Sequence, residues 1–489
     1  MKTRLEHALA VVSPRLNPRP TTLVSALIHL SVIALWVVLF ARAFFLKGVL
    51  AWSAGIAYIA YDTLLLLFVT LKSRSMLRPE VPDIVASASG PRPVTLGVIV
   101  AAYNEASVLP VTLQALFDQI DPPDEIVVAD DGSTDSSATV LERRYGLVRA
   151  PDGEVSAPST RYPNLRWLRV PHGGKARALN AAIGVMSTDA VMTVDADTLL
   201  AAEACQAMRH AFATEAELVA AAGVLTPICG KTSEGRFFQW FQTYEYIRNF
   251  VSRYAWMRAE SLLLISGAFA SFRREALIDV GGFDPECLVE DYELIHRLRR
   301  FSVDHDKRWT VRVIGAAQAF TDAPSTLASF LRQRRRWFAG FLQTQYWNRD
   351  MAGNRRYGAV GLLMMPVKAL DAVQPVYGLT AFVLLLSFLI RGQFTIFGPA
   401  LALIVGKIVI DLAFHVWSVH LYRRWTHNAT TSSFAMALLA ALTEPFTFQL
   451  LRHTGATLGW VHFLGRRKTW GVQHRAGLLG LRRRRRRPE

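Results

Sequence analysis

Four long apolar runs constrain this chain more than any other feature. Residues 23–46 and 49–71 lie near the N-terminus, and residues 360–390 and 396–421 lie in the last third. Each run is long enough to cross a bilayer as a helix, which takes about 20 apolar residues. A signal peptide explains the first run poorly, because that run is too long, no small-residue cleavage site follows, and a second run comes at once. The sequence therefore predicts a membrane protein with a helical hairpin before a long middle section and further spans after it.

Basic residues on both sides of the first hairpin indicate its orientation. They are Lys2, Arg4, Arg15, Arg19, Lys72, Arg74 and Arg78. Because basic loops stay in the cytosol, both ends of the hairpin and the middle section are expected there, in an inner (plasma) membrane protein. A further apolar tract, 433–464, is interrupted by Glu444 and Pro445 and has basic residues on both sides. It is expected to cross twice or to re-enter, which gives four to six spans in all.

Composition narrows the class of protein. Of 489 residues, 51% are hydrophobic and 19% charged, with a mean hydropathy of +0.22, which excludes a disordered chain. The net charge of +16 fits nucleic acid, anionic lipid or an anionic substrate. The arginine run at 482–487 has no interleaved aromatic residues, so a lipid tether is favoured and nucleic acid is not expected. Three cysteines without metal spacing predict no disulfide framework and a reducing compartment.

Polar residues recur inside the later apolar runs, where they are costly. They are Lys407, Asp411 and His415 at four-residue spacing, and Lys368, Asp371 and Gln374 in the preceding run. Two interpretations stay open: a polar stripe that lines a conduit for a hydrated polymer, or buried ion pairs that join helices.

The middle section alternates short β-rich runs with helical stretches, which predicts an α/β domain with a mostly parallel sheet. The clearest strands are 94–104, 125–131, 165–170 and 190–197. Each ends in polar residues, and ligands of such folds lie beyond the carboxyl ends of the strands. Residues 234–258 have an amphipathic pattern, which fits either an interfacial helix on the bilayer or a helix facing the domain core.

Two of these strands end in acid clusters. Asp130 and Asp131 open DDGSTD, while Asp195 and Asp197 form DAD. Carboxylates one residue apart can share a divalent cation that also holds a substrate phosphate, although Asp-x-Asp alone is common in turns. In HGGKARALN, a glycine pair and Lys175 at the opening of a helix suit an anion.

Two later segments add candidate chemistry. In VEDYEL, Glu290 and Asp291 stand at an expected helix start, where a carboxylate either removes a proton from an attacking hydroxyl or merely caps the helix. The stretch FLRQRRRWFAGFLQ precedes the membrane. Its arginines could bind a diphosphate, but Arg334 and Arg335 are expected to meet lipid headgroups, and Trp337 could stack on a sugar.

Taken in order, AAYNE, DDGSTD, HGGKARALN, DAD, VEDYEL and QRRRW resemble the membrane-embedded processive family 2 glycosyltransferases, the group of hyaluronan, chitin, cellulose and poly-N-acetylglucosamine synthases. The resemblance covers residues 95–340 and extends to the flanking helices. It implies a GT-A nucleotide-sugar-binding domain inserted between transmembrane helices. It also implies an inverting transfer from a nucleotide sugar, expected to be UDP-linked, that needs Mg²⁺ or Mn²⁺.

The resemblance also assigns roles to single residues. Asp291, with Glu290 beside it, matches the general base that deprotonates the acceptor hydroxyl, and Trp337 matches the acceptor contact. The metal would be held by Asp197 and Asp195. The residues matching the nucleotide-sugar site are Tyr103, Glu105, Asp130, Asp131, Lys175, Asp195, Gln333 and Arg336.

Differences from individual members narrow the expected product. Neither the FxVTxK segment nor the cyclic-dinucleotide domain of bacterial cellulose synthases is found, whereas SGAFASFRREAL is similar to poly-N-acetylglucosamine synthases and VEDYEL departs from their acid motif. The leading hypothesis is a synthase that extends and exports a polysaccharide. The alternatives are a single transfer of sugar to a membrane lipid and a non-catalytic scaffold. Sugar, linkage and accessory subunits stay open.

The sequence is accordingly divided into five parts. They are an N-terminal arm and hairpin (1–90), a cytosolic GT-A domain (91–330), an interfacial QxxRW segment (331–357), C-terminal transmembrane helices (358–465) and a basic cytosolic tail (466–489).

Overall fold

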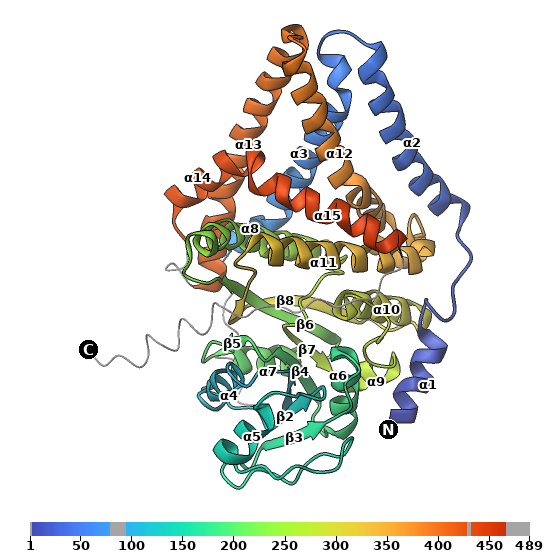
Figure 1. Ribbon diagram of the computed structural model, residues 1–489. Coiled ribbons are helices and arrows are strands. Elements are labelled where there is room, and N and C mark those ends of the chain that lie inside the picture. The colour runs from blue at the N-terminus through green and yellow to red at the C-terminus, as the bar shows by residue number, and fades with distance from the viewer. Residues whose placement is uncertain (1, 79–93, 428–431, 466–489) are drawn as a thin grey trace.

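The computed structural model describes residues 2–78, 94–427 and 432–465, and it places a group of long apolar helices above an α/β domain (Figure 1). The basic tail at 466–489, with its arginine run, lies outside the described residues. The helices of the α/β domain are α4 (Leu109–Phe117), α5 (Ser137–Tyr145), α6 (Lys175–Val185), α7 (Ala204–Thr214), α8 (Ser233–Arg258), α9 (Arg274–Asp279), α10 (Glu290–Asp304) and α11 (Leu327–Trp347). The remaining long helices are α1 (Lys2–Val12), α2 (Leu23–Phe45), α3 (Ser53–Ser73), α12 (Met365–Ile390), α13 (Phe394–Thr426), α14 (Phe434–Thr443) and α15 (Phe448–Leu464).

One sheet of eight strands forms the centre of the domain, in the order β3-β2-β1-β4-β7-β6-β8-β5. The strands are β1 (Leu96–Ala102), β2 (Glu125–Asp130), β3 (Leu165–Arg169), β4 (Ala190–Asp195), β5 (Thr198–Leu200), β6 (Leu218–Ile228), β7 (Phe269–Arg273) and β8 (Thr310–Asp322). The first four are the strands that the sequence predicted. They run parallel. Strand β1 is apolar throughout, and β2 is apolar between Glu125 and Asp130, because a parallel sheet is buried on both faces.

The second half of the sheet is mixed. Strand β7 runs antiparallel to both β4 and β6, while β6 and β8 are parallel. None of β5 to β8 was among the strands singled out from the sequence. The α/β prediction is therefore confirmed, and the parallel part of the sheet is the half that carries the acid clusters.

Helix α8 forms, with α11, a layer between the sheet and the apolar helices (Figure 1). Its buried side chains include Phe241, Tyr244, Ile247 and Val251. It packs on β6 and β8 on one side and on α3 and α13 on the other. The helix at 234–258 is therefore core-facing, and it also lies at the boundary where the interfacial interpretation put it.

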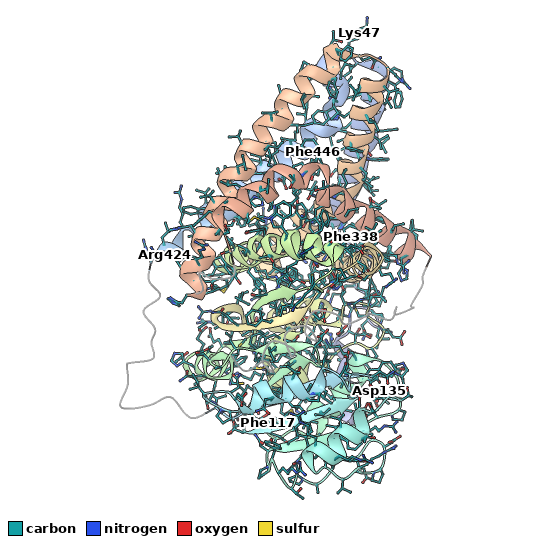
Figure 2. All side chains as sticks on the ribbon, turned by 60° about the vertical axis from the view of Figure 1, so that its left-hand side comes forward. Lys47, Phe117, Asp135, Phe338, Arg424 and Phe446 are labelled. Atoms are coloured by element: carbon teal, nitrogen blue, oxygen red, sulfur yellow. The ribbon has the colours of Figure 1, made fainter. Side chains whose placement is uncertain are left out.

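Four helical segments are long and apolar enough to cross a membrane: Leu23–Phe45, Gly48–Leu77, Val360–Ile390 and Phe394–Thr426. They coincide with the four predicted runs. Lys47 marks one end of this group and Arg424 the end near the domain (Figure 2). The helices in 434–464 form a pair bent by 51°, which is a broken span or a re-entrant loop. The ten residues of α14 rise only about 15 Å, too little for a crossing of its own, so the described residues contain four spans, or five if the bent pair is one span.

Ion pairs join the apolar helices at the polar positions noted in the sequence. The Lys407 ammonium lies 2.6 Å from the Asp62 carboxylate of α3 and also contacts Asp411 on its own helix. Lys368 pairs with Asp371 at 2.8 Å, and Tyr61 of α3 donates to Asp371 at 2.5 Å. An ion pair therefore joins α13 to α3 at Lys407, and a hydrogen bond joins α3 to α12 at Asp371, as the helix-joining interpretation predicted.

The N-terminal arm packs on the α/β domain. Helix α1 contacts α6 and α9, and the Arg15 guanidinium donates two hydrogen bonds, of 2.8 and 3.0 Å, to the carboxylate of the fully buried Asp284. Arg19 pairs with Asp304 at the end of α10. These bonds tie the start of the chain to the segment that leads into α10.

Candidate active site

Three parallel strands bring the predicted site residues to one edge of the sheet. Strand β1 lies between β2 and β4, and the register pairs Ala102 with Asp130 and Ala101 with Asp195. Tyr103 and Glu105 follow β1 directly. The three motifs AAYNE, DDGSTD and DAD therefore meet at the carboxyl ends of neighbouring strands, where ligands of such folds bind.

Asp130 and Asp131 hold loops at this edge. The Asp131 carboxylate accepts from the backbone N–H groups of Gly173 and Gly174 at 2.8 and 3.0 Å, and His172 Nδ1 lies 2.9 Å from it. Asp130 accepts from the Ser133 N–H at 2.8 Å. Gly174 has φ +96°, a backbone conformation that residues with a side chain rarely adopt. The HGG segment is thus fixed against the second strand, immediately before Lys175.

An aromatic surface lies beside these loops. The Tyr103 ring stacks on His172 with centroids 4.3 Å apart and planes 20° apart, and Tyr103 is 43% exposed. The next residue, Asn104, has φ +57°, and its side-chain oxygen accepts from the backbone N–H groups of Thr134 and Asp135 at 2.8 and 3.1 Å. Glu105 is buried. The sequence analysis did not identify Asn104 as a site residue. An asparagine shortly after a strand is the signal that indicates such a turn.

Lys175 connects the DAD motif to VEDYEL. It is the first residue of α6, and its ammonium lies 2.5 Å from Asp195 Oδ1 and 3.7 Å from Glu290 Oε1. Burial acts to lower the pKa of Lys175, but the charges of Asp195 and Glu290 outweigh burial and hold that pKa above its usual value. Burial raises the pKa of Glu290, while Lys175 acts in the opposite direction. A fixed cation therefore lies between the DAD motif and VEDYEL.

Asp291 is held by backbone groups at the start of α10. Its Oδ2 accepts from the Gly267 N–H at 2.7 Å and its Oδ1 from the Tyr292 N–H at 2.8 Å. The residue that caps α10 is Val289, without a side-chain hydrogen bond, so Asp291 is not the N-cap. A Cβ at position 267 would come 2.9 Å from Asp291 Cβ. Gly267 thus sets the position of this carboxylate, a role that the sequence reading of SGAFASFRREAL did not identify.

Gly267→Ala is expected to lower kcat about 10- to 100-fold, because a methyl group would displace Asp291 by a fraction of an ångström or more. The KM for the expected nucleotide-sugar donor should change little, since the three atoms nearest to the added methyl group all belong to Asp291. The measurement is the rate of nucleotide release against the concentration of that donor. Gly184→Ala is the matched control, because nothing lies within 4 Å of its Cβ position. Wild-type kcat in Gly267→Ala would contradict this role.

Helix α11 carries QRRRW close to VEDYEL. Arg336 donates to the Leu288 carbonyl at 3.0 Å, three residues before Asp291. Gln333 is 7% exposed, and its Oε1 has no hydrogen-bond partner among the described residues. Trp337 packs partly buried against the core. Arg336 therefore lies beside the loop that presents Asp291.

The expectation for Arg334 is wrong. Instead of meeting lipid headgroups, its guanidinium donates to both carboxylate oxygens of Glu245 in α8, at 2.9 and 2.6 Å. Glu245 is 1% exposed. Counting basic residues near a membrane could not show this pair, because the two residues are far apart in the chain.

The carboxylates of the DAD motif suit a divalent cation held jointly with a substrate. Asp195 ends β4, and Asp197 immediately precedes β5 and is 3% exposed. Within the described residues no group of three or more His, Cys, Asp or Glu side chains is placed to hold a metal. Mg²⁺ is commonly bound by one or two carboxylates plus substrate phosphates and water, so the donor set fits this use.

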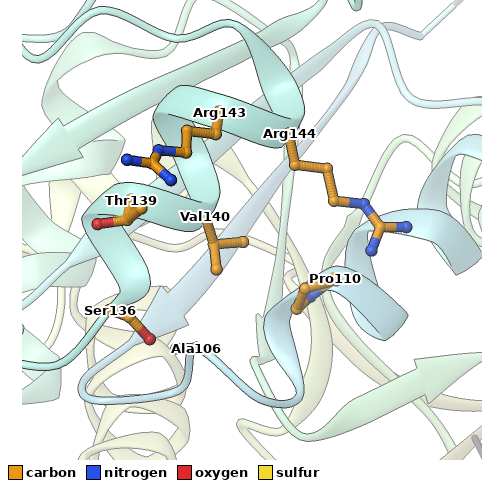
Figure 3. Close-up of a pocket in the computed structure, with 7 residues that line it drawn as sticks. All are labelled: Ala106, Pro110, Ser136, Thr139, Val140, Arg143 and Arg144. Atoms are coloured by element: carbon orange, nitrogen blue, oxygen red, sulfur yellow. The ribbon is translucent and has the colours of Figure 1, made fainter.

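A shallow surface hollow lies on the outer side of the same domain (Figure 3). It is lined by Ala106, Pro110, Ser136, Thr139, Val140, Arg143 and Arg144. Figure 3 shows the two arginines pointing to opposite sides of Val140. The hollow contains none of the predicted site residues, but two residues of its lining, Ala106 and Ser136, directly follow the AAYNE and DDGSTD motifs.

The fold and this arrangement of motifs define a GT-A glycosyltransferase domain. Residues 97–281 match the family described as "Glycosyl transferase family 2", and residues 190–404 match "Glycosyl transferase family group 2". The α/β domain is thus that of a family 2 glycosyltransferase.

Two curated relatives are similar over half of this chain. They are the poly-beta-1,6-N-acetyl-D-glucosamine synthase of Staphylococcus epidermidis, 29% identical over 50% of this chain and 54% of the relative, and that of Staphylococcus aureus, 28% identical over 50% and 53%. The chain therefore spans about half the length of the curated relatives it matches.

One solved structure shares the fold. The mannosyltransferase PcManGT of Pyrobaculum calidifontis, in complex with GDP-Man and Mn²⁺, is 22% identical, with a TM-score of 0.52 over 81% of this chain and 99% of that chain.

Proposed function

We propose that this protein polymerises a nucleotide-activated sugar, UDP-linked, into an exported polysaccharide from an inner (plasma) membrane, with residues 91–330 as the cytosolic catalytic domain. One observation carries the proposal: ionic contacts run unbroken from Asp195 through Lys175 to Glu290, and Arg336 on α11 donates to the Leu288 carbonyl, two residues before Glu290. Donor motif, base and QxxRW helix therefore belong to one cluster. The apolar helices lie directly above α11 (Figure 1), which suits a product that leaves through them.

The similarity to two poly-beta-1,6-N-acetyl-D-glucosamine synthases supports UDP-N-acetylglucosamine as the donor to test first. Tyr103, exposed beside the strand edge, suits the nucleobase, and Glu105, Asp130 and Asp131 hold the loops of the nucleoside pocket. Gln333 has an unpaired buried amide oxygen that would accept a hydrogen bond from substrate. Trp337 offers a ring face to the acceptor sugar.

The transfer proceeds as a single displacement. Asp291 takes the proton of the acceptor hydroxyl, the hydroxyl oxygen forms a bond to the anomeric carbon, and the bond between that carbon and the diphosphate oxygen breaks. Because the nucleophile enters opposite the leaving group, the anomeric centre is inverted. Lys175 and Arg336 stabilise the negative charge that develops on the diphosphate. Asp195 and Asp197 would hold Mg²⁺ or Mn²⁺, which neutralises the same charge when bound.

The test uses purified full-length protein in nanodiscs with a panel of UDP-sugars and Mg²⁺ or Mn²⁺. UDP release and product size are measured together, with and without EDTA. Metal-dependent release from one donor with a long polymer is the expected result. A product of lipid size would instead establish a single transfer to lipid, and no release from any donor, in the presence of either metal, would overturn the proposal.

A further inference from the structure

A chain of buried opposite charges runs from the QxxRW helix to the bent pair of helices. Glu245 of α8 binds Arg334 of α11 through both carboxylate oxygens, and Arg452 Nε of α15 lies 3.2 Å from Glu245 Oε1. Arg452 Nη1 lies 3.2 Å from Glu444 Oε1, and Arg248 of α8 donates to the same oxygen at 2.7 Å. The side chains of Glu245 and Glu444 are 1% and 6% exposed. Helices α8, α11 and α15 and the short helical turn Glu444–Phe446 are therefore linked by one series of ion pairs.

This series of ion pairs ends beside Trp337, the residue expected to contact the acceptor sugar. The Arg334 guanidinium lies 4.9 Å from the centre of the Trp337 ring and 4.7 Å from that of Phe330. Helix α15 presses on the same arginine, since a Cβ at Gly455 would lie 2.6 Å from Arg334 Cβ. A guanidinium with its nitrogens fixed by a carboxylate cannot turn away from the ring it covers. The orientation of Trp337 is thus coupled to Glu245.

Ordinary helix joining does not require this arrangement. A buried ion pair adds little net stability over apolar packing of the same volume, because desolvation of the two charges offsets their attraction. Here one of the charges lies within the motif itself: Arg334 directly follows Gln333, and its guanidinium lies over the Trp337 ring. The specific consequence of the pair is geometry at the QxxRW motif.

We propose that Glu245 is a positioning residue that orients Trp337 through Arg334, and that Arg452 and Glu444 extend this control to the bent helices α14 and α15. The inference rests on the proposed function for the role of Trp337 in binding the acceptor.

The first measurement does not need activity. Full-length protein in nanodiscs is labelled with 5-fluorotryptophan, and the Trp337 resonance is assigned by its loss in Trp337→Phe. Glu245→Gln is expected to shift or broaden that resonance and to leave the tryptophans of other regions unchanged. Glu215→Gln, which removes a partner of Arg312 at a remote surface pair, is the matched control and should change nothing at Trp337. An unchanged Trp337 resonance in folded Glu245→Gln protein overturns the proposal.

The second measurement separates positioning from general damage. With UDP-N-acetylglucosamine as donor and a β-1,6-linked N-acetylglucosamine oligomer as acceptor, Glu245→Gln should raise the acceptor KM about 10-fold or more and shorten the product, at unchanged donor KM. Glu245→Asp retains the charge and should restore part of the product length. If Glu245→Gln does not fold, Arg334→Lys, which removes the fork that binds both oxygens of Glu245, takes its place in both measurements. Equal losses of donor and acceptor binding would contradict the proposal. If wild-type protein transfers no sugar, the proposed function fails, and the resonance alone decides on the coupling.

Discussion

Asp291→Asn is expected to lower kcat for sugar transfer by about 10²- to 10⁴-fold, the usual contribution of a general base. The substitution keeps the shape of the side chain but removes its ability to accept a proton. The carboxylate lies at the start of α10 beside Glu290, the residue that faces Lys175. Affinity for UDP, measured by titration calorimetry, should stay within about 3-fold of wild type, because the donor contacts lie on other side chains.

The fold must be monitored in the same experiment. Both oxygens of Asp291 accept backbone hydrogen bonds, and an asparagine offers one acceptor and one donor, so one N–H loses its partner at a cost of about 1 to 3 kcal/mol. The midpoint temperature of thermal unfolding should therefore be somewhat lower in the variant than in wild type, and the transition should remain cooperative. Asp279→Asn, which removes a surface partner of Lys307, is the control and should keep full activity. Turnover of Asp291→Asn near the wild-type rate would remove Asp291 from the base role.

The parallel half of the domain could be predicted from sequence because its signals are local. An uninterrupted apolar run that ends in aspartate, as in residues 190–197, reads as a buried strand followed by a polar end, and the register places Asp195 beside Ala101. The starts of α6 at Lys175 and α10 at Glu290 were equally local, since glycine pairs and acidic clusters mark helix openings.

The other half depends on pairings between distant segments. Strand β7 enters the sheet antiparallel between β4 and β6, which no local pattern of residues 269–273 specifies. The apolar run of β6, rich in alanine and with a glycine and a proline, has weak strand propensity and becomes a strand through its pairing with β8.

Single site residues show the same difference between local signals, which can be read from sequence, and long-range contacts, which cannot. Asp131 was readable as an acidic residue at a strand end, but its engagement with the Gly173 and Gly174 amides depends on how the HGG loop packs. Arg334 was expected to contact lipid because its partner Glu245 is distant in sequence. Glu245 lies within the amphipathic stretch 234–258, whose pattern does not indicate a partner. Electrostatic partners in buried layers are set by tertiary packing, so sequence gives the charges and the fold gives the pairs.

Lys175→Met is expected to lower kcat/KM for the donor by about 10²- to 10³-fold. Enzymes that lose one fixed group that stabilises developing negative charge lose a similar factor in rate. Methionine keeps the length and apolar body of the side chain but removes the ammonium that lies 2.5 Å from Asp195 and 3.7 Å from Glu290. Lys175→Arg should recover only part of the rate, because a planar guanidinium cannot take the place of a compact ammonium between two carboxylates. Lys307→Met, at a surface pair with Asp279, is the control.

A double-mutant cycle identifies the reason for that loss. Burial already raises the pKa of Glu290 and Lys175 opposes the shift, so in Lys175→Met the pKa of Glu290 should rise further and the group should bind a proton at higher pH. Glu290→Gln imitates this neutral form, and adding it to Lys175→Met should therefore cost little beyond the single variant. The two changes are measured singly and together by UDP release across pH. Fully additive losses would mean that Lys175 acts on the donor diphosphate alone, with no contribution through Glu290.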